Sequence, residues 1–139
     1  MLGIKGKNTK PEILVRKALF AEGYRFRLHR KDLPGSPDVV LPGRKLAIFV
    51  NGCFWHGHTG CRLAKMPATR PEFWRAKLER NKIRDLEAIG ALEKLGWRVL
   101  VVWECFIRKQ TNRVDLGAAI ARWIESEQVF GEFSGQTRL

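Results

Sequence analysis

The sequence lacks any apolar run near the roughly 20 residues that a membrane-spanning helix needs, and its first ten residues are basic with no apolar stretch behind them. We therefore expect neither membrane insertion nor secretion. Acidic residues are few: 14 Asp and Glu stand against 26 Lys and Arg, so the formal net charge is +12. A surface of this sign attracts polyanions, and nucleic acid is the leading partner.

Cysteine is also scarce, with three in the chain, so the thiols cannot all pair with one another. Thiolate ligands or buried thiols are better interpretations than a disulfide framework. Internal repeats and low-complexity linkers are absent as well. With 139 residues, 45% of them hydrophobic, the sequence fits one domain with its own core, 1–139, in which 130–139 form a loosely ordered tail.

The first element expected is a helix at 11–22. Thr9 supplies an N-cap hydroxyl, and Glu12 follows three residues later, where its carboxylate can return to the cap amide. Gly23 is placed to end the helix in the left-handed conformation. The next residues, 24–28, alternate aromatic with basic side chains, which is typical of a strand.

Short runs rich in β-branched residues at 38–41 and 46–50 are separated by a Pro-Gly turn and predict an antiparallel strand pair. The almost wholly apolar run at 97–103 predicts a central strand, because it has no alternating polar face. Residues 112–127 predict a further helix. The order of the elements predicts a mixed sheet between helices, an α/β sandwich.

Strong helix formers fill 71–95, and an irregularity is expected near Asn81. One side of this helix is expected to be a buried apolar stripe. The stripe consists of Leu78, Ile83, Leu86, Ile89, Leu92 and Leu95.

The segment after the strand pair breaks every periodicity and carries unusual chemistry. Cys53, His58 and Cys61 are closely spaced, and Cys105 follows the central strand. Structural Zn²⁺ takes four nitrogen or sulfur ligands, so these four residues would close a tetrahedral shell. The alternative for Cys105 is a small buried hydrophobic side chain beside a strand.

Asp38 stands at the start of the strand pair, and the neighbouring strand ends at Val50. A carboxylate facing a carbonyl of the next strand is a way to hold Mg²⁺, which prefers oxygen ligands. Glu12 could add a third oxygen. Two alternatives stay open: Glu12 serves only as a helix cap, and Asp38 only satisfies a turn.

His56 lies in the same loop as the zinc ligands and is left over once His58 is assigned. A neutral imidazole near a phosphate can act as a general base, with a carboxylate such as Asp85 holding its other nitrogen. The alternative is that His56, rather than His58, binds zinc. His29 precedes a basic loop, and we expect it to be solvated.

Bulky rings in a polar loop need either a core or a ligand to cover them, and stacked bases are such a ligand. Phe54, Trp55 and Trp74 are interleaved with basic side chains, which favours contact with nucleic acid. Core packing is the default for the other tryptophans. These are Trp97, Trp103 and Trp123.

Five segments are distinctive in combination and in order. They are 34–38 (PGSPD), 49–58 (FVNGCFWHGH), 67–74 (PATRPEFW), 81–85 (NKIRD) and 96–105 (GWRVLVVWEC). Together they resemble the very short patch repair (Vsr) DNA mismatch endonucleases, and the likeness extends to about Trp123.

The resemblance implies a restriction-endonuclease-like fold, a structural Zn²⁺, and Mg²⁺-dependent nicking of double-stranded DNA on the 5′ side of the thymine in a T·G mismatch. It implies that Asp38 and the Val50 carbonyl bind Mg²⁺ directly, while Glu12 reaches the metal through water. His56 would activate the attacking water, with Asp85 orienting it. The implied zinc ligands are Cys53, His58, Cys61 and Cys105, and the implied wedge between bases is Phe54, Trp55 and Trp74.

The sequence also departs from the family pattern. Well-studied members carry a second active-site histidine where this chain has Asn51, and an asparagine can orient a water but cannot take a proton near neutral pH. The chain begins close to where the family's DNA-contacting arm is under way, so 1–10 are expected to supply the end of that arm. The interval from His58 to Cys61 is one residue longer than in some relatives. Basic contacts to DNA are expected from Met1, Lys5, Lys7, Lys10 and Arg70.

The expected partner is therefore duplex DNA with a T·G mismatch, bound by a monomer in the bacterial cytoplasm at the nucleoid, with mismatch-repair proteins as further partners. Cleavage would start repair of T·G pairs left by deamination of 5-methylcytosine. Two alternatives remain: a nuclease of the same fold with a relaxed or different substrate preference, and a non-catalytic zinc-stabilised DNA-binding module. The joint presence of Asp38, Glu12 and His56 favours an enzyme.

Overall fold

The computed structural model describes residues 8–110 and 112–135 and contains one mixed sheet with helices on both faces. The strands are ordered β1-β2-β3-β4-β5, with antiparallel pairing from β1 to β3 and parallel pairing from β3 to β5. The helices are α1 (Lys10–Ala21), α2 (Pro71–Lys94), α3 (Glu104–Lys109) and α4 (Arg113–Ile124), and the strands are β1 (Arg27–Leu28), β2 (Val39–Leu41), β3 (Leu46–Asn51), β4 (Arg98–Trp103) and β5 (Phe130–Phe133). The mixed α/β architecture predicted from the element order is confirmed.

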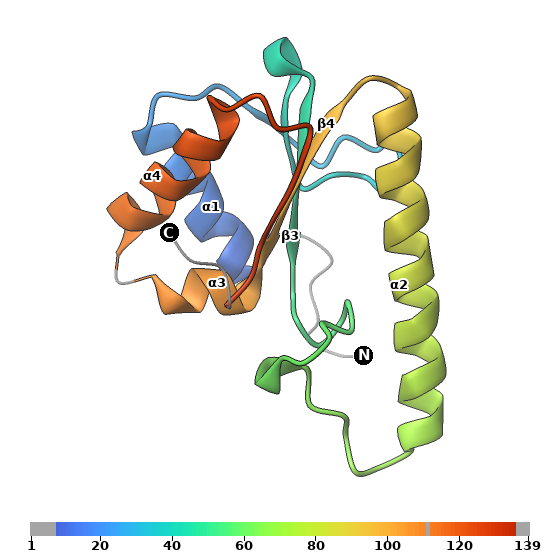
Figure 1. Ribbon diagram of the computed structural model, residues 1–139. Coiled ribbons are helices and arrows are strands. Elements are labelled where there is room, and N and C mark those ends of the chain that lie inside the picture. Colours follow the sequence, from blue (N-terminus) through green and yellow to red (C-terminus); the bar gives the residue numbers. More distant parts are fainter. Residues whose placement is uncertain (1–7, 111, 136–139) are drawn as a thin grey trace.

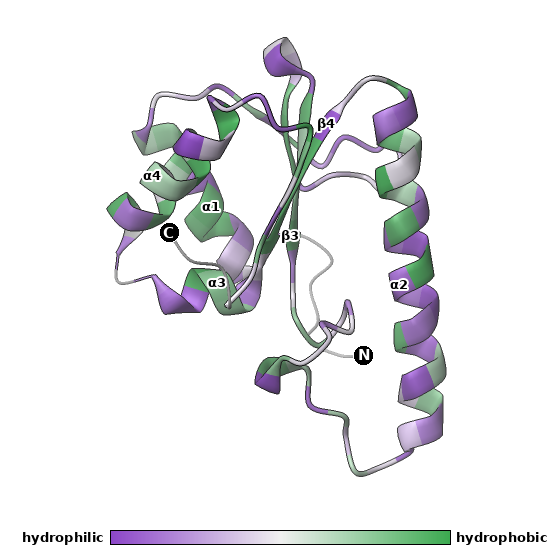
Figure 2. Ribbon diagram, in the orientation of Figure 1, coloured by the Kyte–Doolittle hydropathy of each residue, from purple (hydrophilic) through white to green (hydrophobic). Residues whose placement is uncertain are grey.

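Helices α1, α3 and α4 lie on one face of the sheet, and α2 lies alone on the other (Figure 1). Strand side chains alternate between the two faces, as the pleat requires. Val39 and Ile48 pack toward α1 and α4, whereas Val40 and Ala47 belong to the cluster on the α2 side. Figure 2 shows the apolar strands enclosed between these layers, with polar residues along much of α2.

The beginning and end of α1 agree with the sequence. The Thr9 hydroxyl accepts a hydrogen bond from the Glu12 amide at 3.4 Å, and Gly23 adopts φ +89° just beyond the helix. The strand expected at 24–28 is shorter, because only Arg27 and Leu28 pair with β2 at this edge of the sheet. The antiparallel β2–β3 pair and the interior position of β4 are confirmed.

The prediction for α2 is correct in extent but wrong in its packing. The helix runs without interruption through Asn81, and only Leu78 and Leu92 are buried. Ile83, Leu86 and Leu95, expected in the buried stripe, are 51%, 70% and 56% exposed. Figure 1 shows the N-terminal part of α2 running past the ends of β3 and β4, beside the loop that follows β3. The side of the helix that carries Ile83 is turned away from that loop, because Ile83 lies two residues from both Asn81 and Asp85.

The C-terminal part of the chain differs from the expectation in two places. A short helix, α3, directly follows β4, so Cys105 lies in its first turn rather than at a strand end. Residues 130–133, expected in a loose tail, form β5 and pair in parallel with β4. Gly131 permits this pairing, because a Cβ there would collide with the Trp123 ring. Residues 136–139 lie outside the described part of the chain.

No helix among the described residues combines the length and apolar character needed to cross a membrane.

Candidate active site and metal centre

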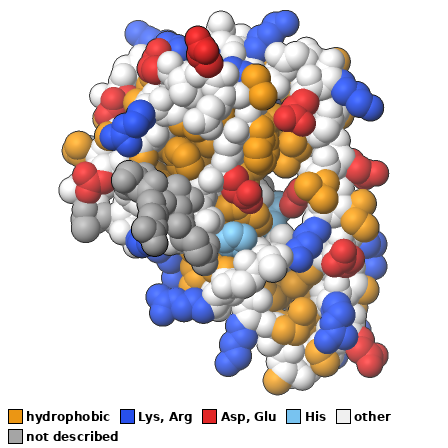
Figure 3. Space-filling model, viewed as in Figure 1, with side chains coloured by type: hydrophobic (Ala, Val, Ile, Leu, Met, Phe, Trp, Pro, Cys, Tyr) orange, Lys and Arg blue, Asp and Glu red, His pale blue; other side chains and the backbone are white. Residues whose placement is uncertain are grey.

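A pocket of about 590 Å³ opens where the start of α1, the end of β3 and the middle of α2 come together. Its lining includes four carboxylates, Glu12, Asp38, Asp85 and Glu104, whereas Arg84 is the one Lys or Arg among its described lining residues. Figure 3 shows acidic and histidine side chains gathered around a hollow on this face. A DNA phosphate could enter so acidic a pocket only with a cation to offset the charge.

Glu12 is almost fully buried, and one of its oxygens has three close polar partners. Oε2 accepts hydrogen bonds from the Asn8 amide at 3.0 Å and from the Arg16 guanidinium at 3.1 Å, and it lies 3.0 Å from His29 Nε2. The expected capping box is therefore displaced by one residue, since the carboxylate returns to Asn8 instead of Thr9. The expectation that His29 is solvated is wrong, because its side chain is 19% exposed and contacts Glu12.

Asp38 is held at the entrance to β2 by the neighbouring strand. Its Oδ2 accepts a hydrogen bond from the Val50 amide at 2.7 Å. Burial, together with the nearby charge of Glu12, raises the pKa of Asp38 from 3.8 to about 6, against the lowering effect of that hydrogen bond. The ligand atoms of Glu12, His29 and Asp38 all lie within 4.8 Å of one another. This arrangement favours a bound cation, because the cation would relieve the repulsion between the two carboxylates.

The segment before Asp38 packs closely against α2. Gly35 has φ +75°, and a Cβ at this position would lie 2.6 Å from the Ala88 side chain. Only glycine satisfies both the backbone angle and the close approach. This contact fixes the distance between the Asp38 side of the pocket and the helix that carries Asp85.

His56 and Asp85 form the expected pair across the pocket. His56 Nδ1 lies 2.6 Å from Asp85 Oδ2, and the His56 amide donates to the Gly52 carbonyl at 3.2 Å. With Nδ1–H donating to Asp85, Nε2 carries the lone pair and is the nitrogen available to a substrate. Both side chains are about one-third exposed, at 31% and 33%, which suits contact with a ligand entering from solvent.

Asn51 ends β3 and also lines the pocket. It is only 5% exposed, yet no residue in the described part of the chain forms a hydrogen bond with its side-chain amide. Its amide nitrogen and oxygen keep contact with solvent in the pocket, because neither is among the fully buried, unpartnered side-chain atoms of the described residues. Asn51 is therefore placed to bind a polar group within the pocket.

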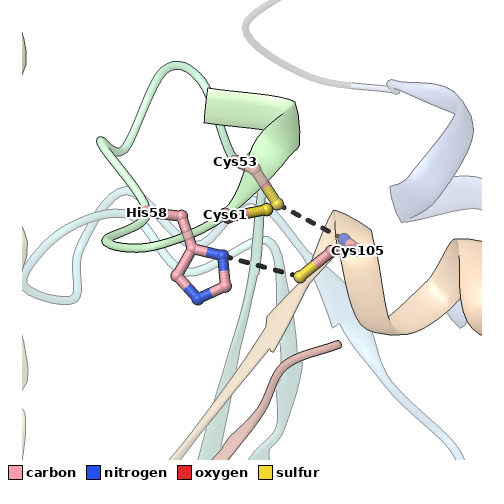
Figure 4. A group of neighbouring side chains, drawn as sticks. All are labelled: Cys53, His58, Cys61 and Cys105. Atoms are coloured by element: carbon pink, nitrogen blue, oxygen red, sulfur yellow. Dashed lines mark hydrogen bonds between the residues drawn. The ribbon is translucent and has the colours of Figure 1, made fainter. Parts of the chain in front are cut away.

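A second cluster is formed by Cys53, His58, Cys61 and Cys105, whose side chains point toward one another in Figure 4. It is next to the pocket along the chain, because Gly52 and Glu104 line the pocket. The four donor atoms lie within 4.8 Å of one another, and His58 Nδ1 is 3.5 Å from Cys105 Sγ. Backbone amides point at two of the sulfur atoms: the Cys105 amide donates to Cys53 Sγ at 3.3 Å, and the Gly135 amide donates to Cys105 Sγ at 3.1 Å. Such N–H···S contacts stabilise thiolates, so this donor set suits a metal ion.

The electrostatics of the cluster point the same way. Burial lowers the pKa of His58, which keeps its imidazole neutral and able to donate a lone pair. Burial also raises the pKa of the Cys53 thiol, so a thiolate here requires a positive partner. The His58 ring stacks on Trp103 at a centroid distance of 3.9 Å, which fixes its orientation.

Phe54, Trp55 and Trp74 form one aromatic group beside the pocket. Their ring centroids are 4.9 to 5.7 Å apart in edge-to-face contacts, and all three side chains are only partly buried. Asn81 of α2 donates to the Trp55 carbonyl at 2.8 Å and so anchors the loop. By contrast, Trp103 and Trp123 are buried and Trp97 is partly buried, as expected for core residues.

The described part of the chain includes two of the basic residues that are predicted to contact DNA, Arg70 and Lys10. Arg70 is exposed, adopts φ +53° just before α2 and lies over the Phe73 ring at 4.5 Å. Lys10 is exposed but already belongs to α1, so it is not part of an extended arm. Met1, Lys5 and Lys7 lie outside the described residues.

Sequence reasoning missed four residues of the site. They are His29, Asn81, Arg84 and Glu104. The spacing of Asn81 and Asp85, four residues apart on one helix, was a usable signal, because it places both on the same face. Nothing in the local sequence links His29 to Glu12, since their contact depends on the β1–β2 pairing.

Three relatives and one family model identify the group to which the chain belongs. The model for DNA mismatch endonuclease Vsr matches residues 1–62. The chain is 52% identical over 122 residues to the type II nicking enzyme V.XorIIP of Xanthomonas oryzae, which covers 88% of this chain and 85% of that protein. It is 44% identical over 110 residues to the type II nicking enzyme V.NmeAIP of Neisseria meningitidis, covering 79% and 78%. It is 40% identical over 138 residues to the DNA mismatch endonuclease Vsr of Escherichia coli, covering 98% and 88%. The chain therefore belongs to the Vsr family of DNA mismatch endonucleases.

Proposed function

We propose that this DNA endonuclease nicks duplex DNA on the 5′ side of the thymine in T·G mismatches, in a Mg²⁺-dependent reaction, and so starts repair of deaminated 5-methylcytosine. The main support is the pocket that holds Asp38 and Glu12 opposite the His56–Asp85 pair. We further propose that 1–139 act as one domain of restriction-endonuclease-like fold, working as a monomer on DNA in the bacterial cytoplasm, with mismatch-repair proteins acting downstream.

The residues around Asp38 fit a divalent cation. Two carboxylates whose oxygens approach within 4.8 Å, one of them with a raised pKa, repel each other when both are charged. The N–H and C=O of one strand residue lie on the same edge of the strand, so the Val50 carbonyl shares the Asp38 edge with the Val50 amide. Asp38 and the Val50 carbonyl would hold Mg²⁺, with Glu12 nearby. When bound, Mg²⁺ polarises the scissile phosphate and stabilises the leaving oxygen.

The protein groups supply the proton transfer. His56 Nε2 accepts a proton from the attacking water, while Asp85 holds Nδ1–H and stabilises the imidazolium that forms. Asn51 cannot take a proton, but its amide can hold that water in line with the phosphate. Proton abstraction in this chain therefore rests on His56 alone.

We propose that Cys53, His58, Cys61 and Cys105 hold a structural Zn²⁺. The support is a set of three sulfurs and one nitrogen gathered at one point, with N–H donors on two of the sulfurs. Elemental analysis should find one zinc per chain. Cys105→Ser should lower thermal stability before it lowers intrinsic nicking, and full stability in that variant would support a buried thiol instead.

We propose that Phe54, Trp55 and Trp74 insert beside the mismatch, where a poorly stacked pair is easier to open than a matched one. Arg70 and Lys10, with Met1, Lys5 and Lys7, would contact phosphates. The exposed Arg70 beside the aromatic group supports this arrangement, because phosphates flank any base that the rings reach.

The deciding experiment is a nicking assay on end-labelled duplexes, one fully matched and one for each mismatch, with and without Mg²⁺. We expect a single nick in the T·G duplex that depends on Mg²⁺. Several relatives are named type II nicking enzymes, and these names favour one alternative, a nuclease of relaxed or different preference. Equal cleavage of all duplexes would support that alternative, and DNA binding without any cleavage would support a zinc-stabilised binding module.

A further inference from the structure

His29 contacts the acidic side of the pocket but has no part in the reaction described above. It directly follows β1, and its Nε2 lies 3.0 Å from Glu12 Oε2. The side chain is 19% exposed, while that of Glu12 is 3% exposed. A histidine so close to a buried carboxylate of the metal site must influence where that carboxylate points.

The backbone at His29 is held in an unusual conformation that aims the ring. His29 has φ +49°, in the left-handed region that residues other than glycine rarely adopt. Its amide donates to the Asp38 carbonyl at 3.1 Å, so it is tied directly to the residue expected to bind the metal. Strained backbone of this kind persists where the surrounding structure requires it, often at functional sites.

The two carboxylate oxygens of Glu12 differ in their hydrogen bonds. Oε2 receives the Asn8 amide and the Arg16 guanidinium and is approached by His29, whereas Oε1 receives no donor from any described residue. Arg16 also lies 3.3 Å from His29 Nε2, so the proton position decides the role of the ring. With the proton on Nε2 the ring is a third donor to Glu12 Oε2, and with the proton on Nδ1 it would accept from Arg16 instead.

Asp38 shows the same division. Its Oδ2 is held by the Val50 amide at 2.7 Å, and its Oδ1 has no donor within the described part of the chain. Each carboxylate thus has one oxygen fixed by the protein and one left for the pocket that both residues line. Metal-binding carboxylates are commonly oriented by hydrogen bonds in this way.

We infer that His29 is a positioning residue for the metal site: its Nε2–H holds Glu12 Oε2 beside Arg16, so that the free Glu12 oxygen stays directed toward the metal held by Asp38. This inference rests on the proposed function, because it requires a divalent cation at Asp38. In this role His29 acts through Glu12 rather than as a metal ligand, because its Nε2 faces Glu12 Oε2.

Two amide substitutions separate this role from a purely structural one. Gln carries an N–H donor at nearly the same reach as imidazole Nε2, whereas Asn is one methylene shorter and cannot reach Glu12. Asn, however, tolerates the left-handed backbone better than Gln. If His29 mattered only for backbone conformation, His29→Asn would therefore be the milder change. If His29 positions Glu12, His29→Gln would be the milder change.

The direct test measures the affinity of the DNA-free protein for Mn²⁺, either by calorimetry or from the electron paramagnetic resonance signal of free Mn²⁺. We expect His29→Asn to weaken Mn²⁺ binding by about tenfold and His29→Gln by less than about threefold. The Mg²⁺ concentration for half-maximal nicking should shift in parallel. In a Glu12→Gln background, His29→Asn should add no further loss.

The outcomes are distinct. Equal Mn²⁺ affinity in His29→Asn and the unsubstituted protein overturns the inference. An equal loss of Mn²⁺ affinity in His29→Asn and His29→Gln also overturns it, because that result would make the imidazole a direct metal ligand. If His29→Asn fails to fold, the comparison of His29→Gln with His29→Phe, which fills the space but donates nothing, decides in the same way. Asp38→Asn tests the proposed function separately: nicking that survives this change defeats the proposed site, whereas lost nicking with unaltered His29 variants defeats only the role of His29.

Discussion

The two faces of the sheet are built from different interactions. On one face, α1, α3 and α4 bury large side chains against the strands, including Leu19, Phe106 and Ile120, which are fully buried. On the other face, α2 contributes only Leu78 and Leu92 to the buried set, although it is the longest helix described. Apolar burial therefore stabilises the first face far more than the second.

Helix α2 makes few apolar contacts but several polar ones, and these are with the loop that follows β3 and carries His56. Asn81 donates to the Trp55 carbonyl, Lys82 donates to the Thr59 hydroxyl at 3.3 Å, and Asp85 pairs with His56. These contacts lie on one side of the helix, at spacings of one and three residues. We conclude that the α1–α4 face maintains the fold, whereas α2 mainly shapes the pocket. Substitutions on the two faces should accordingly separate stability from activity.

Asp38→Asn should have the largest effect on activity. Losing the charged metal ligand should reduce nicking by about a thousandfold or more, because several kcal/mol of transition-state stabilisation are lost, while DNA binding persists. Single-turnover nicking and a binding titration measure the two properties. Asp32→Asn is the matched control, since its carboxylate is 62% exposed and pairs with Arg30 outside the pocket. Nicking by Asp38→Asn at the normal rate would contradict the assignment.

His56→Ala should reduce nicking by about a hundredfold to ten-thousandfold, the usual contribution of a general base, with folding intact because His58 belongs to the other cluster. Asn51→His sharpens the result: a second imidazole in the pocket should maintain or raise the nicking rate. A stably folded Asn51→His protein without activity would show that the pocket is organised differently. Circular dichroism and single-turnover rates provide both measurements.

The two faces can be compared directly by leucine and isoleucine truncation. Ile120→Ala, at a fully buried position of α4, should lower the free energy of unfolding by about 2–5 kcal/mol. Leu86→Ala, at a 70% exposed position of α2, should change it by no more than about 0.5 kcal/mol. Urea unfolding of both variants tests this. A loss above about 1 kcal/mol for Leu86→Ala would mean that this side of α2 is covered in solution.

The raised pKa of Asp38 predicts a pH-dependent stability. Burial favours the protonated carboxyl in the folded state, so its contribution to stability is full below pH 3.8 and is lost as the pH rises through about 6. Without added divalent cation, Asp38→Asn should therefore be more stable than the unsubstituted protein at neutral pH, by about 1–3 kcal/mol. The difference should narrow as the pH falls through about 6. Urea unfolding across this range measures it, and a constant difference would contradict the raised pKa.

Trp55→Ala should change the preference for mismatched DNA and leave the other properties almost unaltered. We expect about a tenfold loss of preference for mismatched over matched DNA, because one ring–base contact contributes about 1–3 kcal/mol. Affinity for matched duplex, and its dependence on salt, should change little, since these depend on phosphate contacts. Phe20→Ala is the control, as Phe20 is an aromatic residue 72% exposed on α1. An equal loss of affinity for matched and mismatched duplex would mean that Trp55 serves packing rather than mismatch recognition.

The sequence predicted the elements whose signals are local and missed those that depend on tertiary pairing. Thr9 and Gly23 mark the limits of α1 through backbone chemistry that a few residues determine. By contrast, Phe130–Phe133 becomes a strand only because β4 presents an unpaired edge. Ile83 is exposed because it lies on the side of α2 opposite Asn81 and Asp85, which contact the loop. In the site, the His56–Asp85 pair was expected from the family resemblance. The contact of His29 with Glu12 joins two elements whose closeness no local pattern encodes.

The Cys/His cluster has a consequence for the order of folding. Cys53, His58 and Cys61 come from one loop, but Cys105 arrives only with α3, after the whole of α2 and β4. A chain emerging from the ribosome therefore holds three donors of an incomplete shell until β4 has been synthesised and paired with β3. Closing so long a loop is slow relative to local helix formation. The cluster is therefore completed only once β4, with α3 after it, has paired with β3. Metal binding would thus act late, locking a topology that the strands have already selected.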